Sequence, residues 1–418
     1  MISLPWDVVR TAVPLNYCSL SKKITLKQIL TTDQNWWRFY KKYEPKLRPA
    51  IIIGITKLLS CRNIIRGYHE YRCSKPGCTH IKRICHTCKC KTCSSCGKKA
   101  TELWIAQQNA LLPKTPWQHI TFTMPQPLWD FFWFNRTLFN KVSALAADCI
   151  QTIAKKKGAI PGIFTALHTF GRDLKRNVHV HLSTTTGGLS FDHSQWKTLY
   201  FDQATLMRMW RYEIVTLLRR EAKKGLVIPP AILKQLNHTC SFYQWLNQLY
   251  KKTWVVHCSK PTEDHQLTVN YLGRYIKRPA IAESKLKHYS GNTISFQYLD
   301  HKTKTYRRLT LSIEQFIVLF IQHIPDLNFK MIRYYGFLSN RTRGALLPIV
   351  YDLIGQEKNE HSKLPTYAEL IQKNFGFNPL ICILCGAPLL LAGIHFGKTN
   401  VYQLLQHHRE LALTKNCD

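Results

Sequence analysis

Residues 177–182, NVHVHL, alternate apolar and polar side chains and therefore predict a β-strand. Its three apolar side chains would face inward, while His179 and His181 would leave the sheet on the opposite face. Two imidazoles on one face can hold a divalent metal ion. An isolated strand of this kind is more often a surface or structural feature, so its meaning depends on the residues that accompany it.

A second stretch, residues 270–279 (NYLGRYIKRP), places Tyr271 and Tyr275 on one face of an α-helix. The acidic residues 263–264 suit the positive N-terminal end of this helix, and Pro279 ends it. Two tyrosines at this spacing usually reflect core or interface packing. Together with the histidine strand, however, they predict a tyrosine that attacks a phosphodiester whose charge a metal ion neutralises.

The composition indicates a basic, folded chain that binds a polyanion. The 418 residues suffice for two or three domains, and 45% hydrophobic and 12% aromatic residues favour packed cores over disorder. The 59 Lys and Arg residues against 24 Asp and Glu give a net charge of +35. Basic residues are interspersed with aromatic ones, which fits a protein that lies along nucleic acid and stacks on unpaired bases. No signal peptide and no stretch of roughly 18 apolar residues is found, which predicts a soluble intracellular protein with no membrane partner.

Eight of the 15 cysteines lie between Cys61 and Cys96. Without a secretory signal, this density predicts a metal site more readily than disulfides. The C-x2-C pair at 93–96 supplies two thiolates from one turn, and a second pair would close a tetrahedral zinc site. One or two structural zinc ions are expected, and a redox or iron–sulfur role is the alternative. The candidate zinc ligands are Cys73, Cys78, Cys88, Cys93 and Cys96.

A last cysteine pair, Cys382 and Cys385, lies near the C-terminus. It could form half of a further zinc site with His395, or with His407 and His408, as partners. A buried structural pair explains the motif equally well.

The periodicity of the remaining chain predicts an α+β fold. Residues 184–188 (TTTGG) are expected to end the histidine strand, and Ser312 to cap a helix. We expect a central antiparallel sheet that carries the two histidines, with the tyrosine helix packed beside it. Helices are predicted within residues 1–60, 101–112, 128–155 and 195–250, and strands at 119–124, 177–183, 254–258, 293–299 and 305–311.

Three regions are expected from these elements. Residues 1–112 form a helical and zinc-binding domain, and residues 113–311 form a nuclease domain with a helical insertion at about 195–250. Residues 312–418 form a mainly helical C-terminal region.

A hard ion such as Mg²⁺ or Mn²⁺ needs more than two protein ligands. His119 is a candidate for the third, because it lies on a predicted neighbouring strand. Glu263, Asp264 and Gln266 near the tyrosine helix are rivals. His257, on the short strand before that helix, suits a packing or outer-sphere position better.

The order of these parts resembles the transposases of the IS-ninety-one insertion sequences, which are rolling-circle enzymes with the histidine–hydrophobe–histidine (HUH) fold, related to Helitron transposases. The resemblance spans roughly residues 60 to 345. The chain departs from the family pattern in the wider spacing of Cys73 and Cys78 and in the additional Cys85 and Cys90. The matching stretches are Cys88-x4-Cys93-x2-Cys96, HITFTMP (119–125), NVHVHLSTTTGG (177–188), WVVHCSKP (254–261), YLGRYIKRPAI (271–281) and MIRYYGFLSNRTR (331–343).

The resemblance implies that Tyr271 and Tyr275 are nucleophiles and that His179 and His181 bind the catalytic metal. The activity implied is nicking of single-stranded DNA at the element ends, through a 5′-phosphotyrosine, followed by strand transfer in rolling-circle transposition. The implied partners are single-stranded and element-end DNA, with hairpin parts as one possible form, and the host replication machinery that extends the freed 3′-hydroxyl. Such a protein would be bacterial, cytoplasmic and associated with the nucleoid; its oligomeric state is left open.

Basic residues would hold the DNA. Arg274, Lys277 and Arg278 form a candidate phosphate clamp, although an ordinary solvated basic face explains them equally well. Duplex or hairpin parts would contact the zinc-binding domain and the basic helices at 205–252. A rolling-circle replication initiator with the same chemistry is the alternative within this class. A zinc-dependent DNA-binding regulator without nicking activity is the alternative from another class, but it would need neither tyrosine nor the histidine strand.

Overall fold

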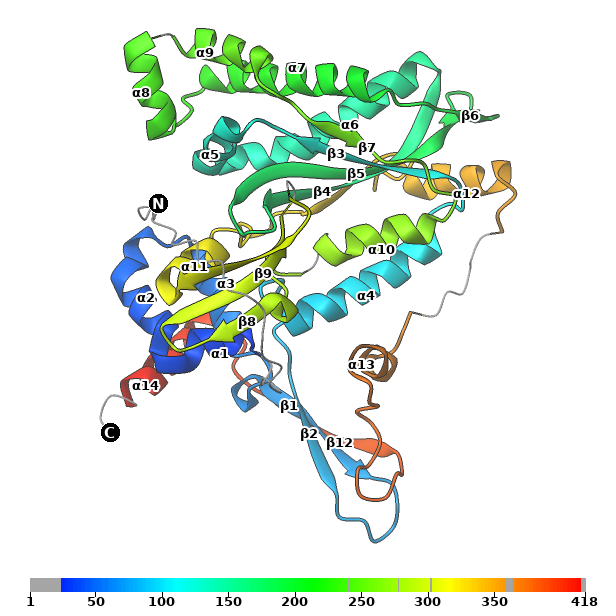
Figure 1. The fold of residues 1–418 in the computed structure, drawn as a ribbon. Helices are drawn as coiled ribbons and strands as arrows, with labels where there is room; N and C mark the ends of the chain where they lie inside the picture. The colour runs from blue at the N-terminus through cyan, green and yellow to red at the C-terminus, as the bar shows by residue number, and fades with distance from the viewer. Residues whose placement is uncertain (1–23, 240, 277, 301–302, 358–363, 415–418) are drawn as a thin grey trace.

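The computed structural model of the protein describes residues 24–414, apart from residues 240, 277, 301–302 and 358–363. For residues 237–239, 274–276 and 412–414 it describes the backbone only. The described residues form helices and antiparallel sheets (Figure 1), so the predicted α+β class is confirmed.

A six-stranded antiparallel sheet carries the histidine strand, in the order β11-β4-β5-β3-β7, with β6 paired to β5. β4 and β5 form a long hairpin in which His168 pairs with His179 and Ala166 pairs with His181. On the other side of β5, Thr121 of β3 lies opposite His181. The strands are β3 (Trp117–Thr123), β4 (Ala159–Phe170), β5 (Arg176–Ser190), β6 (Trp196–Thr198), β7 (Val256–Cys258) and β11 (Ile332–Gly336).

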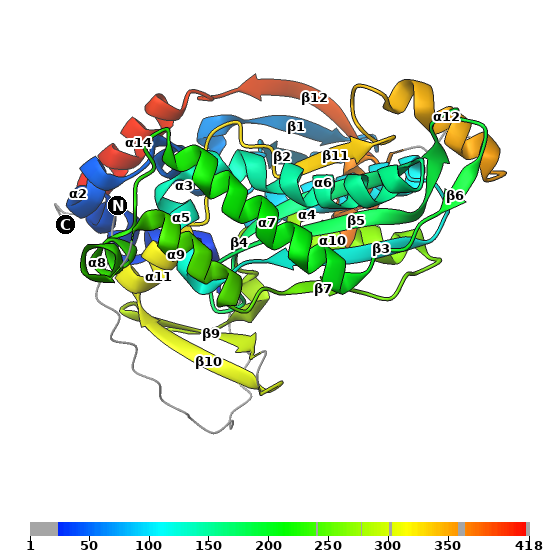
Figure 2. The ribbon, with the colours of Figure 1, turned by 90° about the horizontal axis from the view of Figure 1, so that it is seen from above.

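Helices cover both faces of this sheet (Figures 1 and 2). The apolar residues of 178–182 are buried in the core beneath α5, α6 and α7, with α8 and α9 further along that side. The strand period therefore places His179 and His181 on the opposite face, which α10 and α4 cover. The helices are α4 (Ser94–Leu111), α5 (Gln126–Phe134), α6 (Phe139–Lys156), α7 (Gln203–Ala222), α8 (Pro230–Thr239), α9 (Phe242–Gln248) and α10 (His265–Ile276).

A second core joins the N-terminal helices to a later segment of the chain. α1, α2 and α3 pack against α11 and a three-stranded sheet in the order β10-β9-β8. Ser312 caps α11, as predicted, because its side chain accepts a hydrogen bond from the N–H of Gln315. The elements are α1 (Leu26–Thr31), α2 (Asn35–Tyr43), α3 (Pro49–Leu59), β8 (Leu286–Tyr289), β9 (Thr293–Leu299), β10 (Tyr306–Ser312) and α11 (Ile313–Ile321).

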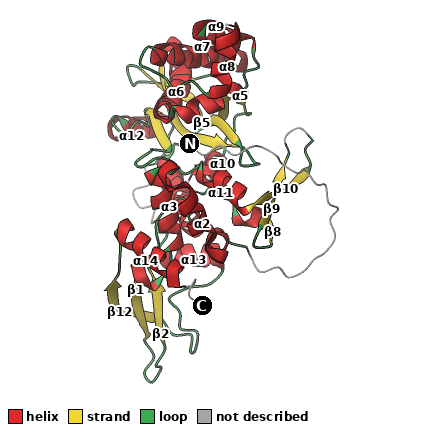
Figure 3. Cartoon of the chain, turned by 90° about the vertical axis from the view of Figure 1, so that its left-hand side faces the viewer, coloured by secondary structure: helices red, strands yellow, loops and turns green. Residues whose placement is uncertain are grey.

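A third sheet projects from the body of the molecule (Figures 1 and 3). Its order is β12-β1-β2, so a strand from the C-terminal region pairs with one from the N-terminal region. The elements not yet named are β1 (Gly67–Cys73), β2 (Ile81–Cys85), α12 (Arg343–Leu353), α13 (Tyr367–Phe375), β12 (Leu389–Phe396) and α14 (Val401–Thr414). In the described part of the chain, no helix is both long and apolar enough to cross a membrane.

The histidine strand is longer than predicted. Residues 184–188 do not end it, because β5 continues to Ser190; that prediction is wrong. Gly187 serves close packing instead of a turn: a Cβ there would lie 2.3 Å from Nε1 of Trp196. β11 also joins this sheet from beyond residue 311, and β8 to β10 pack with the N-terminal helices, so the three expected regions interpenetrate in space.

Candidate active site and zinc clusters

Three histidines of the β4–β5 hairpin meet on the face of the central sheet that α10 covers. His179 and His181 leave β5 on this face, and His168 of β4 lies directly opposite His179. One ligand nitrogen from each lies within 4.8 Å of the others. We call His168, His179 and His181 the three-histidine cluster. His168 was not among the sequence candidates.

Hydrogen bonds orient the two imidazoles of β5 so that both Nε2 atoms face one point. Nδ1 of His179 donates to the carbonyl oxygen of Asn177 at 2.9 Å. Nδ1 of His181 lies 3.1 Å from Nε2 of His119 and can donate to it. With a proton on each Nδ1, the two Nε2 lone pairs face each other at 3.1 Å, a repulsion that a shared cation would relieve.

Burial disfavours the charged form of three of these imidazoles, those of His168, His181 and His119. His168 and His181 are 2% and 7% exposed, and burial lowers the pKa of both well below the ordinary value, with the neighbouring histidines adding to the effect. Burial, followed by the nearby His257, lowers the pKa of His119 to about 4. A neutral imidazole offers the lone pair that a metal ligand requires.

Tyr271 reaches the histidines from α10. Its ring centroid lies 5.0 Å from that of His119 and 6.2 Å from that of His181. The side chain is 43% exposed, so a substrate can approach the hydroxyl from solvent. Asp264 accepts a hydrogen bond from the N–H of Gln266 at 2.8 Å and so stabilises the start of the helix.

The remaining candidates on the tyrosine helix are only partly described. Tyr275 lies one turn further along α10, but its side chain and that of Arg274 lie outside the described residues, as does all of Lys277. The guanidinium of Arg278 lies 3.9 Å from a carboxylate oxygen of Glu102 on α4.

The candidates for a third metal ligand occupy different positions. His119 approaches Nδ1 of His181, on the side away from the Nε2 atoms, and its own Nδ1 lies 3.3 Å from Oγ of Ser183. Residues 263, 264 and 266 are exposed at the start of α10, and His257 is exposed on β7. Among the described residues, none of these joins the three-histidine cluster.

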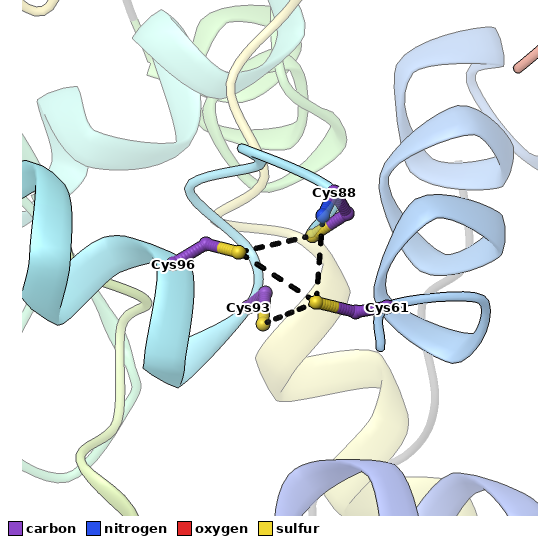
Figure 4. Close-up of side chains that lie close together, drawn as sticks. All are labelled: Cys61, Cys88, Cys93 and Cys96. Atoms are coloured by element: carbon purple, nitrogen blue, oxygen red, sulfur yellow. Dashed lines mark hydrogen bonds between the residues drawn. The ribbon is translucent and has the colours of Figure 1, made fainter. Parts of the chain in front are cut away.

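Four buried cysteines meet between α3 and α4 (Figure 4). Sγ of Cys96 lies 3.6 Å from Sγ of both Cys61 and Cys88, and Sγ of Cys93 lies 3.7 Å from that of Cys61. A tetrahedral zinc ion with Zn–S bonds of about 2.3 Å holds its sulfur atoms about 3.8 Å apart. Hydrogen bonds, the largest with Cys88, lower the pKa of Cys61 to about 7. The spacing of the four sulfur atoms fits one zinc site, which we call the Cys61 cluster.

Cys73 and Cys78 lie apart from the Cys61 cluster. They lie at the end of β1 and in the loop after it, beside Cys382 and Cys385, so the structure divides the five sequence candidates between two groups. The histidines considered as partners of Cys382 and Cys385 are not part of that second group. These are His395, His407 and His408.

Two family models match the chain. A model for a transposase zinc-binding domain covers residues 31–124, and one described as "Putative transposase" covers residues 162–345. The chain is also 40% identical over 378 residues to the transposase for insertion sequence element IS801 of Pseudomonas savastanoi pv. phaseolicola, with 90% of each chain covered. The chain belongs to the IS91 family of transposases. The resemblance inferred from the motifs is thereby confirmed.

A second relative is the "Putative transposase y4qJ" of Sinorhizobium fredii. It is 29% identical to this transposase over 325 residues, which cover 76% of this chain and 81% of the relative. No solved structure matches the chain. The zinc-binding match contains the whole Cys61 cluster, so the family and the geometry both support structural zinc. The second match contains the three-histidine cluster and Tyr271.

The sequence motifs do not indicate two residues of these sites, Cys61 and His168. Cys61 lies inside the cysteine-rich segment but has no C-x2-C partner of its own. His168 precedes the β4–β5 turn at Gly171, and pairing residues 159–170 with 176–190 as a hairpin would have indicated it.

α4 connects the Cys61 cluster of the transposase to the tyrosine helix. Cys96 lies in the first turn of α4, and α4 packs along α10 (Figure 1). The two helices approach closely at Gly273, where a Cβ would lie 2.7 and 2.8 Å from side-chain carbons of Ile105. Because Gly273 follows Tyr271 on α10, the packing of α10 on α4 determines where Tyr271 lies over the histidines.

Gly273→Ala is therefore expected to slow the DNA cleavage that we propose below by about tenfold to a hundredfold, since displacement of a reacting group by about 1 Å costs that much. Alanine favours a helix more than glycine does, so secondary structure should be retained. Single-turnover cleavage of a labelled single strand measures the effect. The matched control is Gly344→Ala on α12, where an added Cβ meets no atom within 4 Å. Combining Gly273→Ala with Ile105→Ala should restore the rate; full activity of Gly273→Ala alone would contradict the coupling.

Proposed function

We propose that the transposase nicks single-stranded DNA by attack of a tyrosine hydroxyl, with Tyr271 as a nucleophile. One observation carries this proposal: a partly exposed phenol lies over a cluster of imidazoles, with its ring 5.0 Å from that of His119. A phenol with an ordinary pKa of about 10 is a weak nucleophile at neutral pH. Cleavage therefore requires a cation at the phosphate, and the imidazoles supply ligands for one.

The three-histidine cluster fits a divalent transition ion. The Nε2 atoms of His179 and His181 are 3.1 Å apart, close to the separation of about 3 Å between adjacent ligands of an octahedral ion with bonds near 2.1 Å. Both Mn²⁺ and Mg²⁺ bind oxygen ligands well, but Mn²⁺, as a transition ion, accepts imidazole nitrogen more readily, so we favour Mn²⁺ over Mg²⁺. When bound, the ion would withdraw charge from the scissile phosphate.

The tyrosine supplies the bond-forming atom. The phenolic oxygen of Tyr271 bonds to phosphorus while the bond from phosphorus to the 3′ oxygen breaks, which leaves a 5′-phosphotyrosine and a free 3′-hydroxyl. The phenolic proton leaves to solvent, because the side chain is 43% exposed and the ring nitrogens of His119 already face His181 and Ser183. Solvent water likewise supplies the proton that the departing 3′ oxygen takes up. The free 3′-hydroxyl is the group that host replication enzymes would extend.

A second nucleophile on the same helix suits strand transfer. α10 carries Tyr275 one helical turn beyond Tyr271. Two hydroxyls would let the enzyme accept a second strand before the first is released, as rolling-circle transposition between donor and target requires.

The position of the helices suggests how the DNA lies. α7, with many of the basic residues of 205–252, covers the sheet face opposite the three-histidine cluster. Duplex held there would be separated from the active site by the sheet. Arg274, Lys277 and Arg278 remain candidates for phosphate contacts beside the nick, although Arg278 also lies near Glu102.

Single-stranded element ends are expected to be cleaved at least about a hundredfold faster than relaxed linear duplex, because sharp bending of duplex costs several kcal/mol. Supercoiled DNA, which melts locally, should fall between them. Incubation with end-labelled DNA and Mn²⁺, followed by denaturing electrophoresis, measures the covalent adduct. A DNA-binding regulator would retain the DNA in native gels and form no adduct. Equal cleavage of linear duplex and single strand would show that this picture of the site is wrong.

A further inference from the structure

A second group of four cysteines lies where the N-terminal and C-terminal regions meet. Cys73 ends β1, Cys78 follows in the adjoining loop, and Cys382 and Cys385 form a C-x2-C turn before β12. Sγ of Cys385 lies 3.4 Å from that of Cys73 and 3.8 Å from that of Cys78, which is 3.9 Å from Sγ of Cys382. All four sulfur atoms lie within 4.8 Å of one another.

We propose that Cys73, Cys78, Cys382 and Cys385, the Cys73 cluster, bind a second zinc ion that ties the C-terminal region to the N-terminal hairpin. The measured separations bracket the value of about 3.8 Å expected between sulfur ligands of tetrahedral zinc. The Cys61 cluster already has four thiol ligands of its own, so it requires neither Cys73 nor Cys78. Cys382 and Cys385 lie outside both family matches, which end at residues 124 and 345.

The backbone around these cysteines is arranged for thiolates. The N–H of Lys75 donates to Sγ of Cys73 at 3.4 Å. Gly386, with φ of +74°, allows the tight turn in which its N–H donates to the carbonyl oxygen of Cys382 at 2.9 Å. Nδ1 of His80 lies 3.1 Å from Sγ of Cys382, where a donated hydrogen bond stabilises a metal-bound thiolate.

β12, the strand that this zinc ion would secure, has few buried side chains to hold it. Of the eight residues of β12, only Leu389 is buried, and Phe396 is 90% exposed. The main-chain pairing with β1 runs from Gly67 opposite Phe396 to Cys73 opposite Leu389. A small sheet that buries so little apolar surface requires a crosslink or a metal to be stable. The zinc ion would crosslink the two strands at the end of the sheet, where the pairing of β1 with β12 stops.

Metal content of the full chain, purified under reducing conditions, tests the proposal. The wild type should contain about two zinc ions per chain, and Cys382→Ser with Cys385→Ser should reduce this to about one. Limited proteolysis should then cleave the chain faster around β12, since the metal no longer holds that strand. The matched control is Cys85→Ser, because Cys85 lies on β2 of the same sheet and belongs to neither cluster. It should retain about two zinc ions.

A measurement on the wild type guards against a variant that fails to fold. Cys73, Cys78 and Cys385 are half-buried, so a thiol reagent should modify them once a chelator removes the metal, and far more slowly before. One zinc ion in the wild type with no further loss in the double variant would overturn the proposal. So would iron in place of zinc, a disulfide detected by mass, or modification of Cys385 in the zinc-loaded protein at the rate of Cys85.

Discussion

Replacing both Tyr271 and Tyr275 with phenylalanine is expected to abolish the covalent protein–DNA adduct and transposition. Loss of a nucleophile costs about 10⁶-fold in rate in a well-studied hydrolase, which places the remaining cleavage below detection. Phenylalanine keeps the ring contacts with His119 and His181 and removes only the hydroxyl. DNA affinity should therefore change by less than about tenfold, which is roughly the change in affinity expected from the loss of one hydrogen bond.

The single variants and a matched control complete this test. Tyr212→Phe removes a hydroxyl from an exposed tyrosine of α7, on the opposite side of the sheet, and should cleave at the wild-type rate. Tyr271→Phe alone should impair the adduct, because Tyr271 lies beside the histidines; Tyr275→Phe alone reports whether the second hydroxyl also forms one. A double variant that still forms a phosphotyrosine adduct would end the assignment of these residues as nucleophiles.

Sequence alone predicts which residues share a face when they belong to the same helix or strand. His179 and His181 share a face because side chains alternate along a strand, and the structure places them together as expected. The helix that carries Tyr271 and Tyr275 likewise follows from local periodicity and from Pro279. Their catalytic and metal-binding roles stay predictions.

Residues that meet through pairing between strands could not be located in this way. His168 reaches His179 only because the β4–β5 hairpin has one particular register, and a shift by one residue would move it to the other face. The sequence of residues 159–170 is largely apolar and shows no alternation that would reveal that face. The apolar character reflects burial on both sides of a central strand.

Contacts between distant segments are harder still to predict. Cys73 and Cys385 are 312 residues apart in sequence, and no local pattern indicates that they approach each other. Each pair is incomplete alone, so the local pattern groups Cys73 and Cys78 with the later cysteines of the same segment. No local pattern indicates Cys61 as a ligand either, since its partners lie beyond β2.

His168→Ala is expected to weaken Mn²⁺ binding and cleavage more than His119→Ala does. His168 belongs to the three-histidine cluster, whereas His119 faces Nδ1 of His181 and orients that ring. Loss of a residue that orients a ligand typically costs about 10- to 100-fold in metal affinity or activity, and loss of a ligand should cost more. Titration of Mn²⁺ by electron paramagnetic resonance measures the affinity, and bound zinc gives no signal in that experiment.

The controls separate a lost ligand from a damaged fold. His168 is only 2% exposed, so His168→Gln, which keeps a polar side chain, accompanies the alanine variant, and thermal unfolding is recorded for both. His288 is exposed on β8, away from the site. The His288→Ala variant should therefore bind Mn²⁺ as the wild type does. EDTA should stop cleavage by the wild type, and added Mn²⁺ should restore it. If His119→Ala loses Mn²⁺ binding while a folded His168→Ala retains it, the third ligand is His119, and the hydrogen-bond directions assigned to His181 must be reversed.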